Sequence, residues 1–438
     1  MFRRRFLVPL LLLAGSTPLL MAQEAEGWSL HGQATVVTQS LSRFSSPYVG
    51  EHSLRPGPER ATSFTTTLMA GWRPWTGAEM YVDAEGAAGK GVGRVLGLAG
   101  AANGETYRVG STDFRAAVAR VWIKQTFDLG GPAQNQTQKV EADAHQLGGS
   151  RAARRLVIHV GKLSVMDIFD ANALAHDPRS QFLNWTLMGH GAWDYPADTR
   201  GYTWGYAAEL YWDDWALRHG RFAEPLEANQ LEMDHGFARA HGDVVELEHG
   251  HSLGGRAGAV RLMAFRNTTR MGDYRQSLAE RPLDPDVAST RAYGRAKRGW
   301  GLNLEQALTA DLGAFARWSW SDGRTESWAF TEADRSASAG FTLKGTAWQR
   351  TQDRVGLAYV QNGLSPDHEA YLAAGGLGFL LGDGRLSYGP ERIAEGYYAL
   401  ALGRYVTAAV DVQRIWNPGY NRDRGPAGLF ALRLHAQF

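Results

Sequence analysis

The sequence predicts an all-β protein: a transmembrane antiparallel β-barrel of about 16 strands with long extracellular loops. Three observations support this fold class. Apolar residues recur at every second position in segments of roughly ten residues, the length of a tilted strand that crosses a membrane. The segments are even in number. The connections between them alternate between short and long, as periplasmic turns and outer loops do.

The composition fits this class and excludes several others. Of 438 residues, 44% are hydrophobic and the mean hydropathy is -0.33, so no segment beyond the N-terminus can be a spanning helix. The 15 Trp, 16 Tyr and 17 Phe suit a protein with two membrane interfaces, although a Trp-rich soluble β protein is the alternative. A net charge of +1 gives no electrostatic argument for nucleic acid, and the absence of cysteine excludes disulfides, thiolate metal sites and cysteine nucleophiles. We expect no cofactor.

Residues 1–22 have the pattern of a secretory signal peptide. Three arginines follow the second residue, an apolar run extends from Phe6 to Ala14, and Leu20-Met21-Ala22 is a plausible cleavage site. The arginine string also resembles a twin-arginine signal. Because that pathway carries folded cargo, and a lipid-facing barrel cannot fold before it reaches its membrane, the general secretion route is favoured. The mature barrel domain is therefore expected to cover residues 23–438.

The last segment, residues 428–438, is the clearest strand. Phe430, Leu432 and Leu434 alternate with Arg433 and His435, and the chain ends on an aromatic residue. Because no open sheet edge survives in lipid, this strand must pair with the first strand. A terminal strand of this kind is also the signal presented to the barrel assembly machinery.

The remaining strands are identified by the same alternation. In chain order, the predicted strands cover 28–40, 64–72, 78–85, 115–128, 156–162, 202–212, 215–222, 244–252, 256–267, 300–308, 312–320, 337–343, 355–359, 398–402, 406–416 and 428–438. Tight turns are predicted at 74–76, 213–214, 254–255, 309–311 and 404–405, and long loops at 41–60, 86–113, 165–201, 268–298, 363–394 and 417–426. The polar, irregular connection 130–153 is too long for a simple turn.

The two faces of the strands differ in charge. The apolar face carries almost none, since an Arg or Lys on the lipid side near the midplane would cost roughly 2–4 kcal/mol. The opposite face collects eight charged residues: Arg120, Lys124, Glu209, Glu305, Arg317, Lys344, Asp411 and Arg433. Individually these residues could simply pair with one another and stiffen the wall, but together they predict a water-filled pore. Trp122, Trp185 and Trp193 are candidates for sugar stacking, with membrane-interface or packing roles as the alternative.

From the long loop onward, the sequence resembles the carbohydrate-selective porin (OprB-type) family. The stretches that carry the resemblance are 161–170, Asp177-Pro178-Arg179-Ser180-Gln181-Phe182-Leu183-Asn184, 362–365, 382–391, 395–398, 417–426 and 433–438. The resemblance covers nearly the whole mature chain and is strongest in the last 80 or so residues. It implies a sixteen-stranded porin of the bacterial outer membrane that passes small sugars through a polar, charged constriction narrowed by in-folded loops.

The loop between Asp167 and Asn184 matches the family pattern and is the best constriction candidate, with Arg120 and Glu209 as wall partners. The predicted pore-lining residues are Arg120, Lys124, Lys162, Asp167, Asp170, Asn172, Asp177, Arg179, Asn184, Trp185, Glu209, Glu305 and Arg317. Expected partners are small carbohydrates, outer-membrane lipid and lipopolysaccharide, and the assembly machinery. The sequence leaves open whether barrels associate as homotrimers.

The leading hypothesis is passive, substrate-preferring diffusion of small, neutral carbohydrates with no chemistry. A general porin, or one selective for small anionic or organic solutes, is the nearest alternative. An enzyme is disfavoured: Glu246 and Glu248 face away from His249 and His251 on a strand, so the four do not form a metal site, and there is no Gly-x-Ser-x-Gly elbow. A surface adhesin acting through the outer loops is a third possibility.

Overall fold

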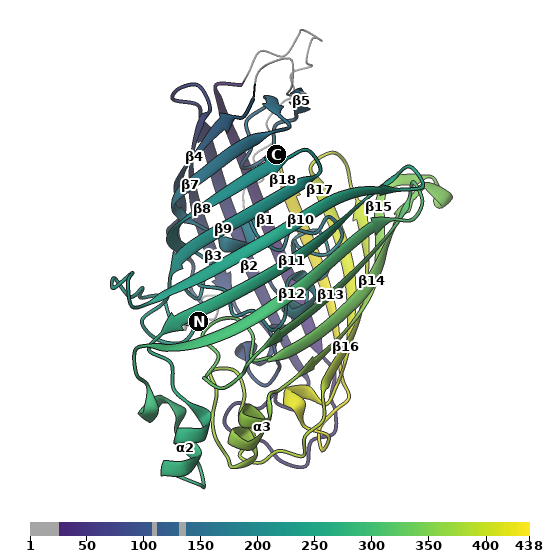
Figure 1. Ribbon diagram of the computed structural model, residues 1–438. Helices are drawn as coiled ribbons and strands as arrows, with labels where there is room; N and C mark the ends of the chain where they lie inside the picture. Colours follow the sequence, from purple (N-terminus) through teal and green to yellow (C-terminus); the bar gives the residue numbers. More distant parts are fainter. Residues whose placement is uncertain (1–25, 107–111, 131–136) are drawn as a thin grey trace, which may run out of the picture.

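Sixteen antiparallel strands close into one barrel in the computed structural model, which describes residues 26–106, 112–130 and 137–438 (Figure 1). Each strand pairs with its neighbours along the chain, and the last barrel strand, β18 (Ala427–Gln437), pairs with the first, β1 (Trp28–Leu41). The closing register runs from Gln33 opposite Gln437 to Leu41 opposite Leu429. The predicted fold class and closing strand are therefore confirmed. The predicted signal peptide, residues 1–22, lies outside the described residues.

The other barrel strands overlap the predicted segments, and most extend further at one or both ends, although residues 202, 308 and 402 lie just outside the observed strands. They are β2 (Glu59–Trp72), β3 (Ala78–Gly89), β4 (Arg115–Asp128), β7 (Arg155–Leu163), β8 (Thr203–Trp212), β9 (Trp215–Ala223), β10 (His241–Leu253), β11 (Arg256–Thr269), β12 (Arg295–Ala307), β13 (Leu312–Ser321), β14 (Arg335–Gly345), β15 (Arg350–Gly363), β16 (Glu391–Ala401) and β17 (Val406–Trp416). Three short α-helices lie in the long connections of the described residues, alongside short 3-10 turns: α1 (Trp185–Met188), α2 (Tyr274–Glu280) and α3 (Pro366–Ala373). No helix in the described part of the chain is long and apolar enough to cross a bilayer.

The barrel has an apolar outer face, as the alternation predicts. On β18, Phe430 and Leu432 are 43% and 51% exposed on the outside, whereas Arg433 between them is 3% exposed and points inward. Trp300 on β12 and Trp318 on β13 likewise lie on the outer face, with ring centroids 6.2 Å apart. In water these side chains would form one continuous exposed apolar surface, so the fold requires an apolar surrounding.

The two ends of the barrel differ in the length of their connections. Short turns, including 213–214 and 254–255, lie at one end, and the long loops with α2 and α3 lie at the other (Figure 1). Gly254 and Gly255 both have positive φ angles, 59° and 77°, as a two-residue hairpin turn requires. The connection 130–153 is the exception at the short-turn end. Predicted to be irregular, it contains a two-stranded antiparallel sheet of β5 (Thr137–Val140) and β6 (Gly149–Ala152).

Residues 164–202, between β7 and β8, form a loop that folds into the barrel, and we call it the inward loop. Its aromatic residues pack against inward-facing aromatics of the wall: Phe169 against Phe222, Trp193 against Phe265, and Phe182 against Phe315 and Tyr397. These side chains are buried. The lumen is therefore not water-filled along its whole length, because this part of the inner wall is covered by the loop.

Candidate functional site

Asp170 is the residue through which the inward loop binds the barrel wall. Its side chain is fully buried, and its carboxylate Oδ1 accepts hydrogen bonds from Arg317 Nε (2.9 Å) and Asn303 Nδ2 (2.6 Å). The backbone N–H of His190, farther along the loop, donates to Oδ2 at 2.7 Å. Arg317 also donates to the carbonyl oxygens of Asp170 (3.2 Å) and Leu187 (3.1 Å). One arginine and one carboxylate thus hold two separate parts of the loop.

Burial and neighbouring charges determine the protonation states of Asp170 and His190. Burial alone would raise the pKa of Asp170, but the positive charge of Arg317, followed by the influence of His190, lowers its pKa overall. Burial lowers the pKa of His190 from 6.5 to about 4, so its ring is neutral at pH 7. Because the unfolded histidine binds a proton more readily than the folded one, stability is lost as the pH falls from 6.5 towards 4.

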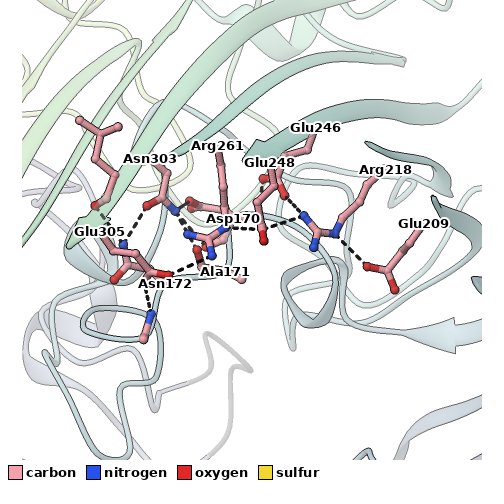
Figure 2. Close-up of polar contacts among 12 residues, drawn as sticks. Asp170, Ala171, Asn172, Glu209, Arg218, Glu246, Glu248, Arg261, Asn303 and Glu305 are labelled. Atoms are coloured by element: carbon pink, nitrogen blue, oxygen red, sulfur yellow. Dashed lines mark hydrogen bonds and ion pairs between the residues drawn. The ribbon is translucent and has the colours of Figure 1, made fainter. Parts of the chain in front are cut away.

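A row of alternating charges, the charged ladder, runs along the inner wall from β8 to β12 (Figure 2). Arg218 contacts Glu209 (2.8 Å), Glu246 (3.0 Å) and Glu248 (3.0 Å). Arg261 then contacts Glu248 (2.7 Å) and Glu305 (3.0 Å). The ladder consists of Glu209, Arg218, Glu246, Glu248, Arg261 and Glu305.

The ladder also holds the tip of the inward loop. Glu246 Oε2 accepts a hydrogen bond from the backbone N–H of Asp170 (2.8 Å), and Glu305 Oε2 accepts one from Ala173 (2.6 Å). Between them, Asn172 Nδ2 donates to Asn303 Oδ1 at 2.7 Å (Figure 2). The loop is therefore held by wall side chains of both β10 and β12, which limits its freedom to move across the lumen.

A second ionic contact fastens the start of the loop to the other side of the barrel. Arg120 on β4 donates to both carboxylate oxygens of Asp167, each at 2.7 Å, and to Asp83 on β3 at 3.0 Å. Its guanidinium lies over the ring of Tyr202, 5.0 Å from the centroid. Bidentate geometry of this kind is stronger and more directional than a single contact.

Between the inward loop and the short-turn end of the barrel lies a chamber of about 810 Å³. Its lining combines charged groups with aromatic rings: Glu79, Trp122, Lys124, Arg155, His159, Asp167, Glu209, Tyr211 and Arg218, among others. Such a surface offers hydrogen-bond donors and acceptors beside apolar ring edges. It suits a small polyhydroxylated solute.

The structure brings eight of the thirteen predicted residues to the chamber or to the docked loop. Lys124, Asp167 and Glu209 line the chamber, and Arg120 binds Asp167. The other four hold or form the loop tip: Asp170, Asn172, Glu305 and Arg317.

Four further predicted residues lie within the inward loop and contact either the loop itself or neighbouring connections. Asp177 accepts from the backbone N–H of Arg179 at 3.0 Å, and Arg179 forms an ion pair with Glu105. Asn184 is fully buried and accepts from the backbone N–H of Thr186 at the start of α1. Trp185 stacks on Phe330, with centroids 4.9 Å apart. Of the two other tryptophans proposed for sugar stacking, Trp193 is buried against Phe265, whereas Trp122 lines the chamber.

Lys162 does not line the chamber. On β7, Val157 and His159 point into the chamber, whereas Lys162 lines a separate small pocket with Glu85, Arg200 and Tyr202 and donates to the carbonyl oxygen of Val118 at 2.9 Å. A pore-lining role for Lys162 therefore stays a prediction.

Sequence reasoning missed Arg218 and Arg261 as the cations of the ladder, although a signal was present. The predicted turn 213–214 places Glu209 and Arg218 at mirrored positions, and the two are register partners. The turn 254–255 does the same for Glu248 and Arg261. Opposite charges placed symmetrically about a tight hairpin turn therefore identify cross-strand ion pairs.

The closed barrel, its apolar outer face, the inward loop and the charged chamber define an outer-membrane porin. A comparison with family profiles identifies which one: the profile described as "Carbohydrate-selective porin, OprB family" matches residues 52–438. The chain belongs to this family, and it forms a carbohydrate channel in the bacterial outer membrane.

Solved structures share the fold. The high-pH structure of Pseudomonas putida OprB matches with a TM-score of 0.71 at 16% identity, covering 94% of each chain. The low-pH structure of the same protein matches with a TM-score of 0.51 at 13% identity, covering 94% of this chain and 93% of that one. The outer membrane channel DcaP of Acinetobacter baumannii gives 0.50 at 9% identity, covering 94% and 97%. A search of curated proteins finds no match.

Proposed function

We propose that small, neutral carbohydrates diffuse past the docked inward loop and then cross the chamber, which Glu209 and Arg218 of the charged ladder line. The observation that carries this proposal is the pairing within the ladder, where every charge has an opposite charge within 3.0 Å. The four carboxylates and two guanidinium groups of the ladder partly offset one another, and Glu209 and Arg218, which line the chamber, present an acceptor and a donor to hydroxyl groups. A neutral sugar can exchange hydrogen bonds with them without carrying charge of its own.

Single-channel recording in planar bilayers tests this proposal. Titration with a neutral hexose is expected to block the ion current in a saturable manner, because the sugar occupies the same passage as the ions. The Arg218→Gln variant should weaken the block, since it removes the chamber-lining donor that Glu209 and Glu248 share. An ion current that neutral sugars leave unchanged would favour the alternative, a general porin or one selective for small anionic or organic solutes.

We further propose that the protein transports solutes without chemical conversion. The support is the function of its family and a polar interior whose charges contact one another and the inward loop. The purified protein should leave lipid and glycoside substrates intact. Hydrolysis of either substrate would contradict the proposal, and cell binding through the outer loops would instead indicate an adhesin.

We also propose that residues 1–22 are removed as a signal peptide and that β18 presents the chain to the barrel assembly machinery. The exposed ring of Phe438 and the alternation of β18 support the second point. N-terminal sequencing of outer-membrane material should begin near Gln23. Crosslinking in native membranes that contain lipopolysaccharide would distinguish a monomer from a homotrimer.

A further inference from the structure

The connection between β4 and β7 carries an inserted hairpin, residues 137–152, at the short-turn end of the barrel (Figure 1), the end that faces the periplasm in outer-membrane barrels. Turns at this end, such as 213–214 and 254–255, need only two residues to join their strands. The added residues of the hairpin are therefore not required for barrel closure. Their contacts show what they do instead.

The tip of the inserted hairpin, His145 to Leu147, enters the mouth of the barrel. His145 Nε2 lies 2.9 Å from the Asp83 carboxylate of β3, and its ring packs edge-on against Trp122 with centroids 5.0 Å apart. The backbone N–H of Leu147 donates to the hydroxyl of Tyr81 at 3.1 Å, and the Leu147 side chain is buried. These partners all point inward from β3 and β4, so the tip is docked on the inner wall.

A second contact holds the base of the tip. The backbone N–H of Gly148 donates to Glu26 Oε2 (2.8 Å), and the backbone N–H of Glu26 donates to the Gly148 carbonyl oxygen (3.0 Å). The tip is thus fastened both to the wall and to the segment that leads into β1. Such two-sided attachment is typical of an ordered element rather than a free surface loop.

The docked tip lines one end of the chamber. His145, Gln146 and Leu147 line the same 810 Å³ space that Asp167 and Ile168 of the inward loop line from elsewhere. Ion pairs also connect the hairpin tip with the inward loop. Asp83 Oδ2 accepts from Arg120 (3.0 Å) and contacts His145 (2.9 Å), while Arg120 binds Asp167 of the inward loop.

We propose that the inserted hairpin is a second constriction of this channel, which sets the size limit for solutes leaving the chamber at its periplasmic mouth. The specificity-determining residues are those of the tip, with Gln146 facing the chamber. This inference rests on the proposed passage of solutes through the chamber. A solute admitted by the inward loop must then pass between the hairpin tip and the wall lined by Arg155, His159 and Arg218.

Cysteine modification tests the proposal at a single chosen position, because the native chain has no cysteine. A Gln146→Cys variant, folded in bilayers, is treated from the periplasmic side with a cationic methanethiosulfonate reagent. The matched control is Glu141→Cys, which lies on the same hairpin but is exposed and does not line the chamber. We expect a stepwise loss of conductance for Gln146→Cys only, with mass spectrometry confirming that both variants react.

A fully modified Gln146→Cys channel with unchanged conductance would overturn the second constriction. A second variant, His145→Ala with Leu147→Ser, releases the tip and should raise both the conductance and the largest sugar that enters proteoliposomes. An unchanged size limit in that folded variant would also overturn it. Hexose block of the unmodified channel tests passage through the chamber separately, so failure of one proposal can be distinguished from failure of the other.

Discussion

Replacement of Arg317 by methionine should release the inward loop while leaving the barrel closed. Arg317 is buried on β13 and donates three hydrogen bonds to the loop: one to the Asp170 side chain and two to backbone carbonyl oxygens. None of these bonds is one of the backbone hydrogen bonds that join neighbouring barrel strands. The perturbation should therefore appear as local opening of the loop rather than as global unfolding.

The magnitude follows from what remains around Asp170. Removing one partner of a buried ion pair costs roughly 3–5 kcal/mol, because the other charge stays buried. Asn303 and the backbone N–H of His190 still donate to the Asp170 carboxylate, so we expect a cost near the lower end, about 3 kcal/mol. At about 1.4 kcal/mol per factor of ten, the open fraction of the loop should rise roughly a hundredfold.

Hydrogen exchange of loop amides measures that fraction, and single-channel recording should show a noisier, larger current. The double variant Asp170→Asn with Arg317→Met removes both charges and should recover most of the loss. The control is Arg221→Met, since Arg221 on the outer face pairs with Asp243 and should change loop opening by less than about 1 kcal/mol. Unchanged exchange at the amides of Asp170 and His190 in the single variant would refute this account of loop docking.

Three further predictions concern the ladder, the pH dependence and the outer face. Arg218→Gln removes one positive charge from the ladder, so the reversal potential in a salt gradient should shift towards cation selectivity; no shift would place the ladder outside the ion path. The inward loop should become more sensitive to protease as the pH falls from 6.5 towards 4, and His190→Asn should weaken that dependence. If the His190→Asn variant shows the same pH dependence of protease sensitivity, another titratable group causes it. Leu432→Arg, halfway along β18, should destabilise the barrel in lipid by about 2–4 kcal/mol in urea unfolding, against a much smaller effect for Gln437→Arg at the strand end. Equal effects at both positions would contradict the lipid-facing assignment.

The alternation of apolar and polar residues was enough to predict the barrel, because every strand shows this alternation in its own sequence. Lipid on one side excludes charge from every second position, so segments such as 115–128 and 406–416 are bounded correctly from local sequence. The same logic placed Arg317 and Glu305 inside. It could also have paired Glu209 with Arg218, because a tight turn determines the register of the two strands beside it.

Only the tertiary structure decided what fills the barrel. An inward-facing residue can meet water or another part of the chain, and the period of two does not distinguish these cases. Phe222 and Phe265 face inward because the inward loop, far away in sequence, supplies their apolar partners. The inserted hairpin likewise reaches Asp83 through contacts between residues 62 positions apart. The sequence by itself determined the wall, since lipid acts on every strand separately; the path through the lumen depends on long-range packing that no single segment encodes.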